Sequence, residues 1–355
     1  MTLRLDRLRA KLDAAGADAM LVGSRANVRY LTGFSGSSSA LYVGRGAAIL
    51  FTDSRYTLQA REEVHGAAVE TVTGPPLKAA LSAAGHLERI GFEADHVSVT
   101  LFGVLGSGAA GRPLVKTSGI VEGLRTVKEP DEIRRIQDSI RLNSQAFEDG
   151  VEAMREGVAE TRVAAAIENA MRERGAEGPA FESIVASGPR GAWPHARASS
   201  RTLRSGEPVV VDIGAILDGY ASDMTRTVFL GEPDALGIRA YAAVLQAVKR
   251  AEGLVRAGVS AAEVDAAARE TIVEAGFAEG AYRHGTGHGV GLEVHEAPHV
   301  GRGTDGVVLA AGMTVTIEPG VYLPGWGGIR IEDVVVVEED GCRVLTATPS
   351  SILTV

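Results

Sequence analysis

Cysteine is nearly absent from this sequence. Cys342 is the only cysteine among 355 residues, so no intrachain disulfide can form and a disulfide-stapled fold is excluded. A chain without disulfides is typical of a reducing compartment, and we expect a cytoplasmic protein. Cys342 follows the turn-like segment EEDG, which indicates a surface bend and not a catalytic thiol.

Long apolar stretches are also lacking. The first residues, MTLRLDRLRAKLDAAG, alternate charged and apolar positions at helical spacing, whereas a signal peptide or a membrane span needs an unbroken apolar segment. We therefore expect no membrane partner, in agreement with a cytoplasmic location.

Positive charge is too scarce for a protein that binds nucleic acid. Lys and Arg number 36 against 45 Asp and Glu, which gives a net charge of −9. Because no basic stripe is available to displace counterions from a phosphate backbone, nucleic acid is not an expected partner. The 45% hydrophobic and 23% charged residues fit a globular protein, and 355 residues favour two domains.

Helical and strand-like segments alternate along the first third of the chain. The patterns predict helices over 3–16 and 75–91 and strands over 19–23, 40–44, 47–56 and 90–95. Such alternation is typical of a small α/β domain, which we place at residues 1–122 and follow with a linker over 123–130.

The second domain, 131–355, begins with two helical patterns. Pro130 suits the first turn of a helix, and apolar residues recur after it at three-, four- and seven-residue spacing up to Met154. A second helix is predicted over 160–175, where a glycine stands at the C-terminal end.

The same order of elements then repeats. Asp218-Gly219 lies between two β-rich runs and favours a tight hairpin turn. Further helices are predicted over 239–258 and 260–276, and further strands over 313–323 and 328–339. Two helices followed by a hairpin, twice over, predict a pseudo-twofold domain.

Each predicted hairpin carries two acids within apolar strand sequence. Asp212 ends the run VVVD and Asp223 follows on the returning strand, while Glu318 and Glu332 occupy comparable places in TVTIEPG and IRIEDV. Any one of them could be a strand-end residue that faces solvent. Four carboxylates buried face to face would be unfavourable without a cation, so the pattern predicts a metal site.

A glycine-rich segment, HGTGHGVGLEVHEAPH, lies between the two acid pairs. Glycines let the backbone approach a bound group closely, and His288 is the better histidine ligand in this segment. One imidazole and four carboxylates suit Mn²⁺, Zn²⁺ or Co²⁺. Five ligands exceed what one ion can use while it keeps positions for water and substrate. We therefore expect two divalent ions per subunit, with Mn²⁺ as the first candidate.

These motifs resemble one known family. VVDIGAILDGYASDMTRT, HGTGHGVGLEVHEAP, TIEPGVY and GIRIEDVVVV are similar, in order and spacing, to the creatinase/methionine-aminopeptidase (M24, "pita-bread") metallopeptidases. NVRYLTGFSGSSSALYV and LFTDSRYTLQA resemble the amino-terminal domain of the proline-specific branch, the Xaa-Pro dipeptidases (prolidases) and aminopeptidases P. The resemblance covers nearly the whole chain. It implies an α/β (α+β) fold, with a small creatinase-like α/β domain before a pseudo-twofold pita-bread catalytic domain.

The resemblance also assigns roles to the five ligands. It implies that Asp212 and Asp223 hold one ion and that His288 and Glu318 hold the other, with Asp223 and Glu332 bridging both. A metal-bridging hydroxide would attack the scissile carbonyl, because coordination lowers the pKa of water towards neutrality. Glu318 would pass the proton to the leaving nitrogen.

Several residues match the family's substrate-facing positions. His195 and His295 would hydrogen-bond the substrate and stabilise the tetrahedral oxyanion. Phe181 would line the site for the residue before proline, near Trp193, although both could instead be core packing. His284 is a further substrate-binding candidate.

Of two arginine positions typical of the family, this sequence has an arginine at one and a histidine at the other. Arg330 shares a strand face with Glu332 and would orient that ligand, although an ordinary ion-paired arginine fits the pattern too. Where prolidases carry an arginine for the substrate carboxylate, this chain has His299. The missing cation could come from the amino-terminal domain, for example from Arg45 or Arg55.

Proline-containing di- or oligopeptides are the expected partners. A bond before proline is a tertiary amide without an N–H, so peptidases that need this donor fail there. We expect an Xaa-Pro dipeptidase, with an Xaa-Pro aminopeptidase that acts on longer peptides as the alternative. Two other possibilities are a non-catalytic pita-bread binding protein and a metal-free creatinase-type amidinohydrolase. The resemblance also implies a homodimer.

Overall fold

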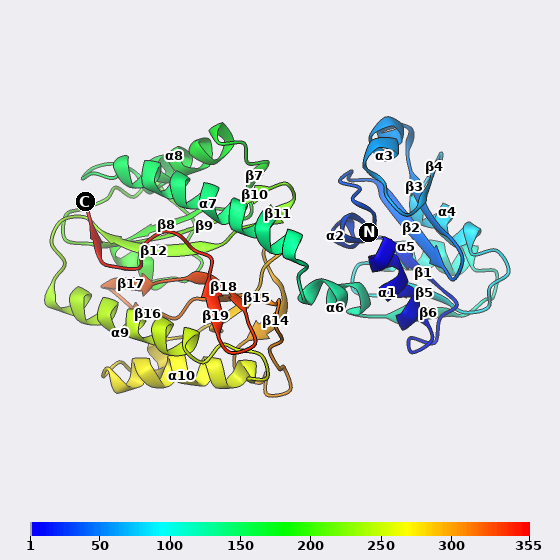
Figure 1. Ribbon diagram of the computed structural model, residues 1–355. Helices are drawn as coiled ribbons and strands as arrows, with labels where there is room; N and C mark the ends of the chain where they lie inside the picture. The colour runs from blue at the N-terminus through cyan, green and yellow to red at the C-terminus, as the bar shows by residue number, and fades with distance from the viewer. Residues whose placement is uncertain (1) are drawn as a thin grey trace. The chain divides into compact units, whose positions relative to one another are not determined.

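The computed structural model describes residues 2–355, which form two compact units (Figure 1). The first unit ends at Arg125 and the second begins at Thr126. The predicted boundary at residue 122 and the predicted linker fall on helix α6 (Ile120–Thr126) and on the residues just after it.

The amino-terminal unit is built on one six-stranded sheet. Its strands stand in the order β4-β3-β2-β1-β5-β6. The strands are β1 (Ala19–Val22), β2 (Ser39–Gly44), β3 (Ala48–Thr52), β4 (Ala68–Thr71), β5 (Ile90–Glu93) and β6 (Leu114–Thr117). The helices are α1 (Thr2–Leu12), α2 (Arg25–Thr32), α3 (Thr57–Glu63), α4 (Pro76–Ala83), α5 (Val99–Gly108) and α6, with a 3₁₀ turn η1 (Ser54–Tyr56).

Local capping explains two helices of this unit that the sequence pattern did not predict, α2 and α5. Ser24 caps α2 by accepting a hydrogen bond from the backbone N–H of Asn27, and Gly33 ends the helix with a φ of 88°. Ser98 caps α5 in the same way. Helices α2 and α5 are only 8 and 10 residues long, so their apolar periodicity is hard to recognise.

Within the described residues, the carboxy-terminal unit contains two helix pairs and four groups of strands. The helices are α7 (Pro130–Glu152), α8 (Glu160–Glu173), α9 (Ala235–Glu252) and α10 (Ala261–Glu274), with 3₁₀ turns η2 (Gly188–Ala192) and η3 (Glu279–Ala281). In its first half the strands are β7 (Gly178–Pro179), β8 (Ile184–Ser187), β9 (Pro208–Ile213), β10 (Ala215–Leu217), β11 (Tyr220–Ala221) and β12 (Met224–Phe229). They continue as β13 (Gly287–Gly289), β14 (Glu296–Val300), β15 (Thr314–Ile317), β16 (Gly320–Leu323), β17 (Gly327–Arg330), β18 (Asp333–Val337), β19 (Cys342–Val344) and β20 (Leu353–Thr354).

Each helix pair covers its own sheet, so this unit has the predicted pseudo-twofold pita-bread build. Helices α7 and α8 share one apolar core with β9 and β12, and α9 and α10 share another with β15 to β18. Figure 1 shows the strands between the two helix pairs. The strand orders are β20-β12-β9-β8 in the first half and β14-β13-β15-β18-β19 in the second.

In both predicted hairpins, each of the two strands is broken in two. Asp218 and Gly219 have φ values of 49° and 79° and join β10 to β11, as the hairpin signal predicts. In the first half, β9 pairs with β12, whereas β10 and β11 belong to a separate sheet. The second half repeats this pattern. Strand β15 pairs with β18, whereas β16 pairs with β17 in a separate ribbon.

The breaks lie next to the predicted acids. The sequence pattern places all four acids within strands, and this expectation is wrong for three of them. Glu318 follows the end of β15, Glu332 precedes β18 and Asp223 precedes β12, so only Asp212 lies inside a regular strand. A residue at a strand end is free of the pleat's strict alternation, and its side chain can be aimed at a common centre. No helix within residues 2–355 is both long and apolar enough to cross a membrane.

Candidate metal centre

All of the predicted site residues line one cavity of about 1120 Å³ in the carboxy-terminal unit. The set comprises Phe181, His195, Asp212, Asp223, His284, His288, His295, His299, Glu318, Arg330 and Glu332. These positions are spread over 152 residues of sequence, so the fold brings them together from both halves of the unit.

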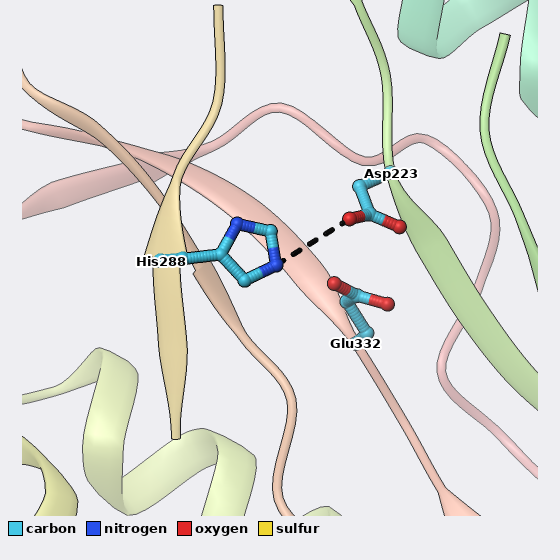
Figure 2. A group of neighbouring side chains, drawn as sticks. All are labelled: Asp223, His288 and Glu332. Carbon is cyan, nitrogen blue, oxygen red and sulfur yellow. Dashed lines mark ion pairs between the residues drawn. The ribbon is translucent and has the colours of Figure 1, made fainter. Parts of the chain in front are cut away.

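Three of the predicted ligands form a compact cluster at the floor of the cavity. Donor atoms of Asp223, His288 and Glu332 all lie within 4.8 Å of one another, and all three residues are buried. Figure 2 shows the three side chains converging from separate segments of the chain. Glu318 is adjacent, because its Oε1 lies 3.4 Å from Nε2 of His288.

The hydrogen bonds of His288 determine which ring nitrogen is free. Its Nδ1 lies 3.1 Å from the carbonyl oxygen of Gly289, and a carbonyl can only accept, so Nδ1 carries the proton. The unprotonated Nε2 therefore faces Oδ2 of Asp223 at 3.6 Å and Oε1 of Glu318 at 3.4 Å. A lone pair that faces two carboxylates is the arrangement of a metal-ligating histidine.

Close backbone packing explains the glycines around this histidine. A Cβ built on Gly287 would collide with the carbonyl oxygen of Thr316 on the neighbouring strand. The hydroxyl of Thr316 also accepts a hydrogen bond from the backbone N–H of His288 at 3.0 Å. Glycine at position 287 thus lets β13 approach β15 closely enough to hold His288.

Burial makes the cluster unfavourable as a set of free charges. It raises the pKa of Asp223 and of Glu332 well above the usual range, and the charges of neighbouring carboxylates add to the effect. Burial also raises the pKa of Glu318 to about 8 and lowers the pKa of His288 to about 4. Without a cation, burial and mutual repulsion favour the protonated forms of these acids.

The donor set fits divalent cations. Oδ1 of Asp212 is buried and has no hydrogen-bond partner among residues 2–355, although Oδ2 of the same carboxylate is paired. A buried carboxylate oxygen without a partner is unfavourable unless something positive faces it. Carboxylate oxygens with one imidazole are ligands for Mn²⁺, Co²⁺ and Zn²⁺, and the absence of thiolate argues against softer metals.

Arg330 contacts a different acid from the one that the sequence pattern indicated. Its Nη2 donates to Oδ2 of Asp212 at 2.5 Å, whereas Glu332 is reached only through Thr225. The Thr225 hydroxyl accepts from Nε of Arg330 at 3.0 Å and donates to Oε2 of Glu332 at 2.7 Å. The reason is strand pairing, because Thr225 on β12 lies directly opposite Asp212 on β9.

His284 has both ring nitrogens engaged within the protein. Its Nδ1 lies 2.8 Å from the carbonyl oxygen of Gly285 and its Nε2 lies 2.7 Å from the hydroxyl of Tyr322. Burial lowers the pKa of His284 to about 3, and the positive charge of Arg330 adds to that shift. This histidine lines the cavity but offers the substrate no free nitrogen in this arrangement.

The other predicted substrate residues lie on the cavity wall. The imidazole of His295 packs against that of His288 with ring centroids 4.3 Å apart, and burial lowers the pKa of His295. His195, His299 and Phe181 also line the cavity. Trp193 is 60% exposed, so the core-packing interpretation of this residue was wrong.

Sequence reasoning missed Tyr322, Thr225 and Thr316, which hold the ligands and their partners. Tyr322 lies four residues after Glu318, and Thr225 lies two residues after Asp223. Both are fully or almost fully buried. Their polar side chains within apolar strand sequence were the available signal, because a buried hydroxyl requires a partner.

Comparisons with known proteins identify one family along the chain. The profile of metallopeptidase family M24 matches residues 134–339, and that of the creatinase/prolidase N-terminal domain matches residues 4–127. A Xaa-Pro dipeptidase of Pyrococcus furiosus is 35% identical over 355 residues, which cover 99% of this chain and 100% of that protein.

Solved structures give the same result. A Xaa-Pro dipeptidase from Bacillus anthracis superposes with a TM-score of 0.96 at 35% identity, over 99% of both chains. An X-Pro aminopeptidase from Thermotoga maritima superposes with a TM-score of 0.91 at 38% identity, over 99% of this chain and 100% of that one. These proteins share the whole two-unit build of the present chain.

Proposed function

The chain belongs to metallopeptidase family M24, and on that premise we propose that it hydrolyses the peptide bond before proline, with Xaa-Pro dipeptides as substrates. The observation that carries the proposal is the cluster of Asp223, His288 and Glu332, whose donor atoms lie within 4.8 Å of one another at the floor of a peptide-sized cavity. Full-length similarity to proteins named Xaa-Pro dipeptidase supports the choice of proline.

Asp212, Asp223, His288, Glu318 and Glu332 would hold two divalent ions, with Mn²⁺ as the first candidate and Zn²⁺ or Co²⁺ as the others. The chemistry that such ions supply is deprotonation of a water near neutral pH and polarisation of the scissile carbonyl. The fit of the residues rests on the free Nε2 of His288 and on the unpartnered Oδ1 of Asp212.

Glu318 is the proposed proton carrier between the attacking water and the leaving nitrogen of proline. Its Oε1 lies 3.4 Å from Nε2 of His288 and its side chain lines the cavity, so the carboxylate is placed between the metal cluster and the substrate space. His195 and His295 are proposed to hydrogen-bond the substrate at its carbonyl. The lowered pKa of His295 keeps its ring neutral, with one donor and one acceptor nitrogen.

Arg330 is proposed to keep Asp212 in place. Its guanidinium donates to Asp212, to the carbonyl oxygen of Pro194 and to the hydroxyls of Thr225 and Tyr322. Five polar groups are thereby held in one network, which makes the carboxylate position insensitive to the arrival of substrate.

The cavity also suits a substrate without an amide N–H at the cleaved bond. Phe181, Ile184, Pro194 and Val300 give its wall apolar patches next to the polar floor. Such patches can contact a pyrrolidine ring, and selection by ring shape requires no hydrogen bond from the substrate.

Xaa-Pro aminopeptidase activity on longer peptides is the second candidate. The structural similarity to an X-Pro aminopeptidase over both chains favours it. The cavity volume of about 1120 Å³ exceeds the ~300–1,000 Å³ typical of small-ligand pockets, so a longer peptide is not excluded by size.

The test uses metal-depleted protein that is reloaded with Mn²⁺, Zn²⁺ or Co²⁺ and given Ala-Pro, Ala-Pro-Ala and Ala-Ala. Release of alanine is measured for each. We expect cleavage of Ala-Pro above all and none of Ala-Ala. A preference for Ala-Pro-Ala would move the assignment to the aminopeptidase, and no cleavage with any metal would reject both. Light scattering in the same buffers tests the proposed homodimer.

A further inference from the structure

Five arginines line the cavity, and they differ in what they contact. Arg330 is paired with Asp212, Arg269 with Asp265, Arg197 with Glu182 and Arg302 with Glu279. The fifth, Arg283, has no carboxylate partner among residues 2–355. It is therefore the cavity arginine whose positive charge is not compensated within the protein.

Arg283 uses only part of its guanidinium. Its Nε donates to the carbonyl oxygen of Gly280 at 2.8 Å, while Nη1 and Nη2 make no hydrogen bond to any residue of the described chain. Two parallel N–H groups on the outer side of a guanidinium match the two oxygens of a carboxylate. The side chain is exposed, so a ligand in the cavity can reach it.

The backbone on both sides of Arg283 is tied down. Arg269 on α10 donates to the carbonyl oxygens of Tyr282 and His284, and it is itself held by Asp265 at 2.8 Å. Its guanidinium also lies 4.3 Å from the ring centroid of Tyr282. Arg283 thus extends from a fixed segment, which lowers the entropy that a ligand must overcome.

This segment borders the metal centre. His284, the next residue, has its Nδ1 3.9 Å from Oε2 of Glu318. A dipeptide whose scissile bond lies at the metal cluster carries its terminal carboxylate only one residue away, or up to about 3.6 Å of extended chain. The side chain of an arginine adjacent to His284 is long enough to bridge such a gap.

We propose that Arg283 binds the free C-terminal carboxylate of the peptide and so selects dipeptide acids. This inference rests on the proposed peptidase function and names the group that replaces the missing arginine at position 299. The predicted source in the amino-terminal unit is less suited, because Arg45 is paired with Asp13 and Arg55 with Asp53.

Charge balance supports the assignment. Arg330 and Asp212 form a neutral pair beside the metal cluster, so this arginine gives little attraction for an anion. The pairs Arg197–Glu182 and Arg302–Glu279 are also neutral, and an incoming carboxylate would have to displace their own acids. Arg283 can bind it without breaking an ion pair.

The experiment compares Ala-Pro with its amide, Ala-Pro-NH₂, on the Mn²⁺-loaded protein. For the wild type we expect faster cleavage of the acid. Arg283→Met should lower kcat/KM for the acid about 10- to 100-fold, as loss of a charge-assisted hydrogen-bond pair predicts, and should change the amide less than about twofold. The loss should lie in KM with kcat nearly unchanged, because this contact is the same in the ground and transition states. Arg283→Lys should recover part of the preference.

Arg302→Met and Arg197→Met test the rival cations. The proposal would be overturned if the preference for the acid over the amide disappeared in either variant and persisted in Arg283→Met. It would also be overturned if Arg283→Met lost activity equally on the acid and the amide. If the wild type cleaves neither peptide, the proposed function fails on its own. Calorimetric titration of wild type and Arg283→Met with the two peptides then tests the role of Arg283. We expect the variant to lose about 10- to 100-fold in affinity for the acid and none for the amide. Equal affinity of wild type and variant for the acid would reject the proposal.

Discussion

Tyr322 donates its single hydroxyl proton to Nε2 of His284 across 2.7 Å. The direction follows from the other neighbour, because Arg330 can only donate, and its Nη1 lies 2.8 Å from the same hydroxyl oxygen. Burial raises the pKa of Tyr322 to about 12, so the proton stays on the hydroxyl at any working pH. The chain of contacts from His284 through Tyr322 and Arg330 ends on Asp212.

Tyr322→Phe should therefore weaken the metal centre without unfolding the protein. The ring still fills its place, but Arg330 loses one acceptor and His284 loses its donor. Removal of a group that contacts a ligand directly typically costs about 10- to 100-fold in metal affinity or activity. Tyr322 acts through Arg330, so we expect a loss of about 10-fold or less. Calorimetric titration of the metal-depleted variant with Mn²⁺ measures the effect, and affinity equal to that of the wild type would contradict this role.

Asp223→Asn should have opposite effects on the metal-free and the metal-loaded protein. In the metal-free protein, the amide removes one of the buried carboxylates that repel each other, so the melting temperature at pH 8 should rise. Metal then stabilises the wild type by about 2.7 kcal/mol at a concentration 100-fold above Kd, whereas the variant should gain little. Thermal unfolding with and without Mn²⁺ checks both signs, and a lower melting temperature for the metal-free variant would argue against the repulsion.

The ion pair of Lys128 and Glu296 should be important for the stability of the carboxy-terminal unit. Nζ of Lys128 lies 3.2 Å from Oε2 of Glu296, and the two side chains are only 1% and 6% exposed. Lys128→Met leaves the carboxylate buried without this cation and should lower the free energy of unfolding by about 3–5 kcal/mol. The exposed Lys249→Met is the matched control, with an expected change within about 0.5 kcal/mol.

A double variant distinguishes loss of the ion pair from loss of packing by the Lys128 side chain. Glu296→Gln added to Lys128→Met removes the buried negative charge that faced Lys128, so the double variant should be more stable than Lys128→Met alone. Urea midpoints of the variants give the comparison. A double variant that is less stable than Lys128→Met would show that the pair is not what holds this segment.

Glu252 should make stability fall as pH rises. Burial, followed by the charge of Asp333, raises the pKa of Glu252 to about 7, above its ordinary value near 4.5. Between these two values the folded state holds a proton that the unfolded state has lost, so the free energy of unfolding decreases with rising pH. Glu252→Gln should remove that part of the slope between about pH 4.5 and 7. Melting temperatures over this range measure it, with the exposed Glu339→Gln as control.

Cys342 should be a poorly reactive thiol. Burial and the nearby Glu252 raise its pKa to about 11, and its Sγ lies 3.4 Å from the backbone carbonyl oxygen of Glu252. Compared with an ordinary cysteine, the thiolate fraction at pH 8 should fall roughly 100-fold. Titration with an aromatic disulfide reagent should be slow in the native protein and fast in denaturant, and equal rates would reject this environment.

Much of the fold could be read from local patterns. Apolar runs predict β1, β2 and β5 close to their observed limits, and Pro130 marks the first residue of α7. Strands β15 to β18 could not be separated in this way, because TVTIEPGVYL and GIRIEDVVVV are each rich in β-forming residues on both sides of the break. Which residues pair there depends on strands that meet only in the folded chain.

The metal-binding candidates were predictable because residue type and spacing along the chain indicate which side chains can bind a metal. Their hydrogen-bond partners were not. Arg330 lies two residues from Glu332 in sequence, but its closest acid in space is Asp212, 118 residues away. Arg283 stands in no recognised motif, and its importance emerges only after the other cavity arginines are found to be paired.

The sequence by itself determined the kinds of donor atoms, the apolar periods that form the two units and the family to which the chain belongs. These properties depend on residue type and on neighbours close along the chain. The tertiary structure decided which atoms face one another, which nitrogen of His288 is free and which cavity arginine has no carboxylate partner among residues 2–355. Those properties depend on burial and on strand register between distant segments, and these exist only once the chain has folded.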